Sequence, residues 1–198
     1  MLKEFRRIGR ELARMNLISS HGGNMSVRMG ERILITRRGC MLSQLGKDDL
    51  IEVDLMKEDS GVIMASSELI VHRAIYQETS ALAVLHCHPP SAILLSLFVD
   101  EIIPLDSEGS YLLRRVPVLS WERTVGSEEV AKEVSAGLKD YKVVMVRGHG
   151  SFAIGEMLEE ALMFSSALEV SSQIVILSRL LGEEVKEYRK KSEEYTKW

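Results

Sequence analysis

The segment ALAVLHCHPP, residues 81–90, combines the signals of a buried strand with two closely spaced histidines. An apolar run that ends at paired prolines predicts a strand up to His88, and the prolines predict a helix over 91–98. Side chains alternate between the faces of a strand, so His86 and His88 should point to one side and Cys87 to the other. Two imidazoles on one face suit one metal ion, but a His-x-His pair alone is equally compatible with two ordinary histidines.

Helical and strand patterns alternate on both sides of this segment. Residues 25–28 and 33–36 are predicted to form a hairpin through Met29-Gly30, and either Ser66 or Ser67 is expected to cap the next helix. Several strand pairs resemble hairpins, so we expect a three-layer αβα sandwich around a mixed, mainly antiparallel sheet rather than a doubly wound parallel one. Apolar periodicity predicts helices over 2–15, 68–77, 128–138 and 157–181, and further strands over 50–55, 116–119, 143–146 and 152–154.

The chain has the length and composition of one globular domain. It contains 198 residues, of which 45% are hydrophobic, and no repeat, linker or change of composition marks a second domain. We therefore expect a single domain over residues 1–182, followed by a charged tail over 183–198.

Charge and hydropathy exclude several classes of partner. The formal net charge of −4 and the sparse aromatic residues argue against a nucleic-acid surface. The charged N-terminus lacks the apolar core of a signal peptide, and the most apolar stretch, 92–99, is too short to cross a bilayer. Cys40 and Cys87 could form one disulfide at most and are best interpreted as buried small residues. The sequence predicts a soluble, cytoplasmic protein with neither nucleic acid nor membrane as a partner.

A third histidine strengthens the metal hypothesis. His149 lies in a Gly-His-Gly turn directly after the apolar strand 143–146, and flanking glycines allow a backbone to approach a ligand closely. Three imidazoles with one open position are typical of a catalytic rather than a structural zinc site. We expect His86, His88 and His149 to hold one Zn²⁺, although three imidazoles also accept Co²⁺, Mn²⁺ or Fe²⁺.

Two polar turns are candidate anion sites. Ser66-Ser67-Glu68 places two hydroxyls and free backbone N–H groups at a helix N-terminus, where the helix dipole favours an anion. The glycine-rich turn 21–24 could cradle a phosphate in the same way. Each is also compatible with a simple structural role, as a helix cap or an ordinary turn. His72 is interpreted as a packed or hydrogen-bonded helix residue.

Five motifs in order make the sequence resemble the class II aldolase/adducin family over about residues 1–182. The resemblance implies an αβα subunit in a four-fold ring, with active sites between neighbouring subunits. It also implies zinc on the three histidines and a general acid/base at Glu68. The motifs are Gly23-Asn24-Met25-Ser26, Thr36-Arg37-Arg38-Gly39, Ser66-Ser67-Glu68 with His72, His86-Cys87-His88-Pro89 and Gly148-His149-Gly150.

The resemblance further implies a phosphate site and a catalytic tyrosine. Relatives often have Thr-Pro-Ser/Thr-Gly at 36–39, so Arg38 replaces a phosphate-binding hydroxyl here; arginine binds phosphate bidentately, but it could also serve another anion or a subunit contact. The small hydroxyl residue expected before the first motif is likewise replaced by His21-Gly22. Tyr111 is the candidate for a tyrosine lent by a neighbouring subunit. The residues implied to bind phosphate are Gly23, Asn24, Gly39, Ser66 and Ser67, to which we add Arg38.

The implied activity is an aldolase that reversibly cleaves a ketose 1-phosphate into dihydroxyacetone phosphate and an aldehyde. The substrate would resemble L-fuculose 1-phosphate or a 5-deoxypentulose 1-phosphate, and zinc would stabilise an enediolate while Glu68 moves the proton at carbon. A methylthioribulose-1-phosphate dehydratase and a ribulose-phosphate 4-epimerase are alternatives on the same fold. A zinc hydrolase and a non-catalytic, adducin-like interaction module also remain. Tyr188, Tyr195 and Trp198 in the tail could contribute to the pocket for the variable end of the substrate.

Overall fold

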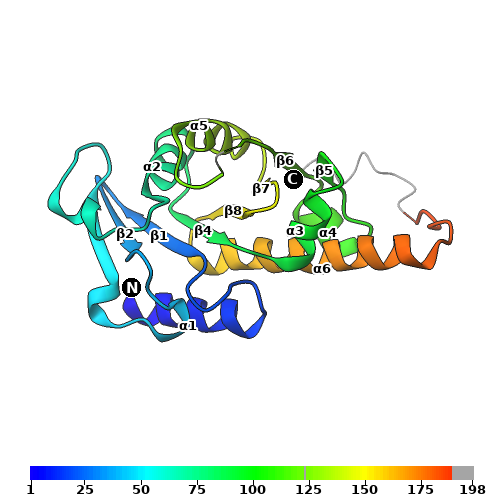
Figure 1. Ribbon diagram of the computed structural model, residues 1–198, viewed down its shortest axis with the longest axis horizontal. Coiled ribbons are helices and arrows are strands. Elements are labelled where there is room, and N and C mark those ends of the chain that lie inside the picture. The colour runs from blue at the N-terminus through cyan, green and yellow to red at the C-terminus, as the bar shows by residue number, and fades with distance from the viewer. Residues whose placement is uncertain (123, 189–198) are drawn as a thin grey trace.

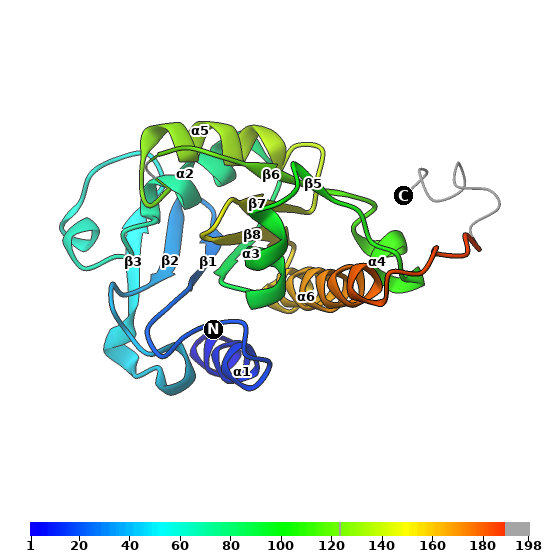
Figure 2. The same ribbon diagram turned by 45° about the vertical axis from the view of Figure 1, so that its right-hand side comes forward.

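The computed structural model describes residues 1–122 and 124–188 and has one eight-stranded sheet between two layers of helices (Figures 1 and 2). The strand order is β3-β2-β1-β4-β8-β7-β6-β5, and every neighbouring pair is antiparallel except β6 and β7. The predicted mixed, mainly antiparallel αβα sandwich is therefore confirmed. The strands are β1 (Asn24–Met29), β2 (Arg32–Thr36), β3 (Leu50–Asp54), β4 (Ala83–Cys87), β5 (Glu101–Ile102), β6 (Val116–Leu119), β7 (Val143–Val146) and β8 (Gly150–Gly155).

Two hydrophobic clusters separate the two helical layers. Alternation along β4 directs Ala83, Leu85 and Cys87 into the cluster shared with α1 and α6, while Val84 enters the cluster shared with α2 and α5. His86 follows the same alternation and faces the α2 side. The helices are α1 (Leu2–Arg14), α2 (Leu69–Glu78), α3 (Pro90–Ser96), α4 (Ser107–Leu112), α5 (Glu128–Gly137) and α6 (Leu158–Leu181).

Several predicted elements differ from the structure in detail. Neither serine caps α2: the helix begins at Leu69, its N-cap is Glu68, and Ser66 Oγ instead accepts from the Glu68 N–H at 3.3 Å. Strand β4 ends at Cys87, so His88 lies just beyond it. The short elements α4 and β5 were not predicted, nor were the 3-10 turns at 42–44, 47–49 and 60–63.

Helix α6 is the longest helix and packs across β4 and β8. By length and composition alone it could cross a bilayer, which the sequence analysis, focused on residues 92–99, did not consider. However, 56% of its most apolar window is buried against the rest of the chain, as in the core helix of a globular protein. The helix ends at Gly182, whose φ of +69° is readily adopted by glycine.

Other predictions concern single residues. Cys40 and Cys87 are both free and buried, as expected, and burial raises the pKa of each thiol to about 11. Of the aromatic residues assigned to the tail, Tyr188 is half exposed. Tyr195 and Trp198 lie outside the described residues.

Candidate metal and substrate site

His86 is oriented by two neighbours on the adjacent strand β8. Its Nδ1 lies 3.0 Å from the carbonyl oxygen of Ser151, and its ring stacks on Phe152 with 4.3 Å between the ring centroids. Because a carbonyl oxygen can only accept, Nδ1 carries the ring proton of the neutral imidazole. The Nε2 atom therefore keeps its lone pair, which is the state a metal ligand requires.

His88 meets this free nitrogen from the start of the loop after β4. Its Nε2 lies 3.0 Å from Nε2 of His86, and its own backbone N–H donates to the Leu17 carbonyl at 2.7 Å. Gly22 permits this placement, since a Cβ there would lie 2.8 Å from the His88 ring. For comparison, two imidazole nitrogens on one tetrahedral zinc ion with Zn–N bonds of about 2.1 Å lie about 3.4 Å apart.

His149 completes the cluster from the turn between β7 and β8. The turn is tied to the end of α3, because Gly148 N–H donates to Ser96 Oγ at 3.0 Å and Arg147 donates to the Ser96 carbonyl and to Asp100. One ring nitrogen from each of His86, His88 and His149 lies within 4.8 Å of the others. Segments far apart in the sequence are thereby brought to one point.

The electrostatics of the cluster suit a cation. Burial, together with the other two histidines, holds the pKa of His86 well below its usual range, and burial lowers that of His88 to about 4. Burial also lowers the pKa of His149, which the nearby backbone of Thr124 partly offsets. All three rings are therefore neutral near pH 7, with lone pairs available for a Lewis acid. The donor set fits zinc, with three imidazoles and, among the described residues, no further side chain in the cluster.

Comparison with known proteins assigns the chain to a family. Residues 3–176 match the model of the class II aldolase and adducin N-terminal domain. The chain belongs to the class II aldolase/adducin family. It is 30% identical to an L-fuculose phosphate aldolase of Methanocaldococcus jannaschii, over 90% of this chain and 97% of that protein. It is 27% identical to the Escherichia coli L-fuculose phosphate aldolase, over 88% of this chain and 82% of that protein.

Solved structures agree with the sequence comparison. The crystal structure of an L-fuculose-1-phosphate aldolase from Thermus thermophilus superposes with a TM-score of 0.87 and is 38% identical, covering 93% of this chain and 97% of that one. YgbL from Klebsiella pneumoniae, described as a putative aldolase/epimerase/decarboxylase, has a TM-score of 0.81 at 24% identity and covers 93% of this chain and 91% of its own. The second likeness shows only the fold. The first extends over nearly the whole aldolase chain.

Glu68 is a buried carboxyl group of this class II aldolase family member. Its side chain is 2% exposed; Oε2 accepts from the Gly126 N–H at 3.2 Å, while Oε1 is buried without a hydrogen-bond partner among the described residues. Burial raises the pKa of Glu68 to about 7, against the smaller lowering effect of the Gly126 hydrogen bond. A carboxyl group with a free oxygen and a pKa near neutrality is suited to accept and return a proton.

The loop before α5 links Glu68 to the histidine cluster. Gly126 donates to Glu68, and the backbone of Thr124, two residues earlier, interacts with the ring of His149. Gly126 has a φ of +55°, and a Cβ there would lie 2.6 Å from the Ser67 carbonyl oxygen. Gly126 was not predicted as a site residue, since its only signal in the sequence is a glycine before the helix-capping Ser127.

Three of the motifs implied to bind phosphate lie side by side. Thr36 belongs to one of these motifs and contacts the other two. Its Oγ1 accepts from the Met25 N–H at 3.2 Å, and its carbonyl accepts from the Ser66 N–H at 3.1 Å. Asn24 in turn is the cross-strand partner of His86, which places this region next to the histidines. The sequence motifs thus converge at one end of the neighbouring strands β2, β1 and β4, around the start of β1.

The anion-binding groups are fewer than the sequence predicted. The Ser66 N–H donates to the Thr36 carbonyl and the Glu68 N–H donates to Ser66 Oγ, so the free backbone donors expected at the start of α2 are in part absent. In the described chain the Ser67 N–H makes no hydrogen bond, and Ser67 and Gly39 are exposed. Arg38 is exposed too, whereas the neighbouring Arg37 is paired with Asp49 at 2.7 Å.

Tyr111 lies away from these motifs in sequence and on a different layer of the fold. It is on α4, which packs against α6, and its side chain is 43% exposed. Asp106 anchors α4 by accepting from Ser171 Oγ on α6 at 2.7 Å. An exposed tyrosine in this position is compatible with use by a neighbouring subunit.

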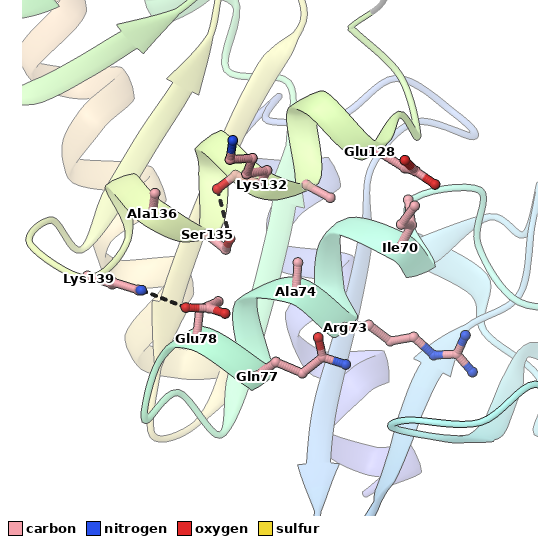
Figure 3. Close-up of a pocket in the computed structure, with 11 residues that line it drawn as sticks. Ile70, Arg73, Ala74, Gln77, Glu78, Glu128, Lys132, Ser135, Ala136 and Lys139 are labelled. Carbon is pink, nitrogen blue, oxygen red and sulfur yellow. Dashed lines mark hydrogen bonds and ion pairs between the residues drawn. The ribbon is translucent and has the colours of Figure 1, made fainter.

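A groove elsewhere on the described surface is separate from the candidate site. It measures about 560 Å³, runs between α2 and α5, and contains the ion pair of Lys139 with Glu78 at 2.6 Å (Figure 3). None of the predicted site residues lines it. The groove therefore lies between two surface helices and apart from the candidate site.

Proposed function

We propose that this protein is a metal-dependent aldolase that reversibly cleaves a ketose 1-phosphate to dihydroxyacetone phosphate and an aldehyde. The observation that carries the proposal is the convergence of His86, His88 and His149 with their ligand atoms within 4.8 Å. Membership of the class II aldolase/adducin family and the likeness to L-fuculose phosphate aldolases over nearly the full chain support the reaction type.

In this proposal the three histidines hold one Zn²⁺ and leave a position open for substrate. Bound zinc would supply Lewis-acid stabilisation of the negative charge that develops on the substrate oxygens during carbon–carbon cleavage. The Ser151 carbonyl keeps the lone pair of His86 directed into the cluster. The stacked ring of Phe152 holds the plane of that imidazole.

Glu68 acts as the general acid/base. In the cleavage direction a base removes the proton of the hydroxyl group whose carbon becomes the aldehyde, and an acid returns a proton to the carbon of the other fragment. The unpartnered Oε1 of Glu68 is free to exchange that proton, while the Gly126 N–H holds the other oxygen in place. A pKa of about 7 lets one carboxyl group serve in both directions near neutral pH.

The phosphate group of the substrate would bind where the three motifs meet. The proposed ligands offer a side-chain amide, two hydroxyls and one guanidinium, and binding there would convert remote affinity into orientation of the reacting carbon. Tyr111 would reach the site of a neighbouring subunit in a homotetramer, and we place the enzyme in the cytoplasm. The proposed ligands are Gly23, Asn24, Arg38, Gly39, Ser66 and Ser67.

The reaction is tested by product formation. Zinc-loaded protein is incubated separately with L-fuculose 1-phosphate, a 5-deoxypentulose 1-phosphate, methylthioribulose 1-phosphate and ribulose 5-phosphate, and dihydroxyacetone phosphate is measured with a coupled dehydrogenase. We expect this product from at least one of the first two substrates. Loss of water from methylthioribulose 1-phosphate or epimerisation of ribulose 5-phosphate, without dihydroxyacetone phosphate from any ketose 1-phosphate, would overturn the aldolase assignment.

Metal content separates the enzyme from a non-catalytic module. We expect about one equivalent of zinc per subunit in the wild type and less than about one tenth in His149→Ala, because two imidazoles alone seldom retain zinc. The exposed His21 provides the matched control, and His21→Ala should keep the full equivalent. A wild type that binds no transition metal under zinc-replete conditions would favour the adducin-like interaction module.

A further inference from the structure

A buried chain of polar groups runs from α2 to the start of β1. Tyr76 Oη lies 2.8 Å from Ser26 Oγ, Ser26 Oγ lies 2.7 Å from Nδ1 of His72, and Nε2 of His72 lies 2.6 Å from Oδ1 of Asn24. Tyr76, Ser26 and His72 are at most 1% exposed. His72 and Tyr76 are four residues apart on α2 and so share the helix face turned to β1. Of these four residues, the proposed function uses only Asn24, as a phosphate ligand.

The direction of each hydrogen bond follows from the tyrosine. Burial raises the pKa of Tyr76, so its phenol is neutral and carries a proton. Among the described residues, Ser26 Oγ is the side-chain partner that lies within hydrogen-bond distance of the phenol oxygen, so we assign it as the acceptor of the phenol proton.

The positions of the remaining protons then follow one after another, from Ser26 to Asn24. Ser26 has one hydroxyl proton, and since its oxygen accepts from the phenol, that proton is donated to Nδ1 of His72. Burial lowers the pKa of His72 to about 3, so the ring is neutral and has a single N–H, which must be on Nε2. This N–H donates to Asn24, and only the amide oxygen of Asn24 can accept it. The orientation of the Asn24 amide therefore follows from the proton chain.

The orientation of the Asn24 amide decides whether its NH₂ group or its carbonyl oxygen faces the site. With its oxygen held by His72, Asn24 leaves its NH₂ group without a hydrogen-bond partner in the described part of the chain, beside its cross-strand partner His86. The opposite orientation would present a carbonyl oxygen, which repels a phosphate or any other anionic oxygen. We propose that His72 is a positioning residue that holds Asn24 with its amide N–H groups toward the substrate, with Tyr76 and Ser26 setting the His72 tautomer. The inference rests on the proposed function only in taking Asn24 as a ligand of an anionic substrate group.

The tautomer of His72 can be measured without an assay of enzyme activity. In the zinc-loaded full-length protein with ¹⁵N-labelled histidine, long-range ¹H–¹⁵N spectra distinguish a protonated Nε2 from a protonated Nδ1. We expect His72, assigned by the signals missing in His72→Gln, to show a protonated Nε2 and an unprotonated Nδ1. A protonated Nδ1, or an imidazolium near neutral pH, would overturn the inference.

Binding of inorganic phosphate to zinc-loaded variants tests the effect on the site. We expect His72→Phe and Tyr76→Phe to bind phosphate about five- to tenfold more weakly than the wild type, the effect of one misdirected hydrogen bond. His72→Gln should restore most of the affinity, because its amide nitrogen can donate to Asn24 in place of Nε2. Tyr141→Phe, a matched change at a tyrosine outside this chain of polar groups, should bind phosphate like the wild type. Zinc content should be unchanged in all four.

Two outcomes of the binding experiment count against the proposal. Equal phosphate affinity in His72→Phe and the wild type would show that Asn24 needs no positioning. Equal loss in His72→Gln and His72→Phe, at full zinc content, would indicate a packing role for the ring. The proposed reaction fails separately: a protein that binds phosphate in this pattern yet forms no dihydroxyacetone phosphate would refute the aldolase and keep the role of His72.

Discussion

At the residue scale, the surroundings of Glu68 determine how the protein should respond to pH. The carboxyl group is buried beneath the loop that contains Gly126, and among the described residues only its Oε2 accepts a hydrogen bond. Its pKa rises from 4.5 to about 7 in the fold, so the folded chain binds the Glu68 proton more tightly than the unfolded chain does. The stabilising contribution of protonated Glu68 is complete below about pH 4.5 and is lost as the pH rises through 7.

Glu68→Gln should therefore stabilise the metal-free protein in a pH-dependent way. A neutral amide avoids the cost of burying a charge, so the variant should exceed the wild type in free energy of unfolding by up to about 3 kcal/mol at about pH 8, and the difference should fall below about 1 kcal/mol at about pH 5. Urea unfolding of chelator-treated protein at both pH values measures it, while activity is lost. Glu78→Gln, at an exposed carboxylate paired with Lys139, is the control and should change little. A difference that does not vary with pH would contradict the assigned pKa.

Side chains of the site were more predictable from the sequence than the groups that hold them. His86, His88, His149 and Glu68 stand out because their residue types, in these motifs, match metal and proton chemistry. The Ser151 carbonyl and the Gly126 N–H are backbone groups from distant segments, and every residue has such groups. Only the folded arrangement reveals which backbone group is used.

At the scale of elements, α3 connects the metal cluster to the long helix α6. Glu169, 6% exposed on α6, accepts from the Ser91 N–H at 2.9 Å and from the Ala92 N–H at 3.3 Å at the start of α3. Two prolines separate this point from His88. The carboxylate satisfies amides that the helix itself leaves unpaired and interacts favourably with the helix dipole. Fixing the start of α3 in this way also limits the freedom of His88.

Glu169→Gln should loosen this connection. An amide accepts with one oxygen and lacks the charge, so we expect a loss of about 1–2 kcal/mol in stability and weaker zinc binding, measured by thermal unfolding and metal titration. Glu159→Gln is a matched change on the same helix, at a carboxylate paired with Arg7 on the surface, and should alter neither quantity appreciably. Unchanged zinc affinity in Glu169→Gln would show that α3 does not constrain His88.

The predictability of elements followed their length. Long periodic segments such as α6 and the apolar strands β4 and β7 were identified within a few residues. Helix α4 has 6 residues and strand β5 has 2, too few for a hydrophobic period to be recognised. Sheet order was not predicted at all, since the pairing of β1 with β4 and of β4 with β8 depends on contacts remote in sequence.

At the scale of the whole molecule, the end of α6 extends beyond the sheet and exposes apolar side chains (Figure 1). Leu177 and Leu181 are 59% and 75% exposed, and their spacing of four residues places them on one helix face. Such a surface is typical of a contact between subunits. It supports the proposed homotetramer, in which the exposed Tyr111 would act across an interface.

Light scattering coupled to size-exclusion chromatography tests this assembly. We expect a mass of four times the 22.3 kDa subunit for the wild type and a smaller species for the double variant Leu177→Glu and Leu181→Glu, because buried unpaired charges oppose association. Ile63→Glu, at a residue 77% exposed in a 3-10 turn, is the control and should remain tetrameric. A monomeric wild type at micromolar concentration would refute the tetramer.

Gly150 sets a boundary for redesign of this protein. A methyl group at this position would lie 2.6 Å from the His88 ring and 3.0 Å from the His86 ring, and it would also collide with the Cys87 carbonyl oxygen. Even alanine would thus force apart the two imidazoles that a metal must bridge. Libraries that seek new aldehyde specificities should therefore leave this glycine unchanged.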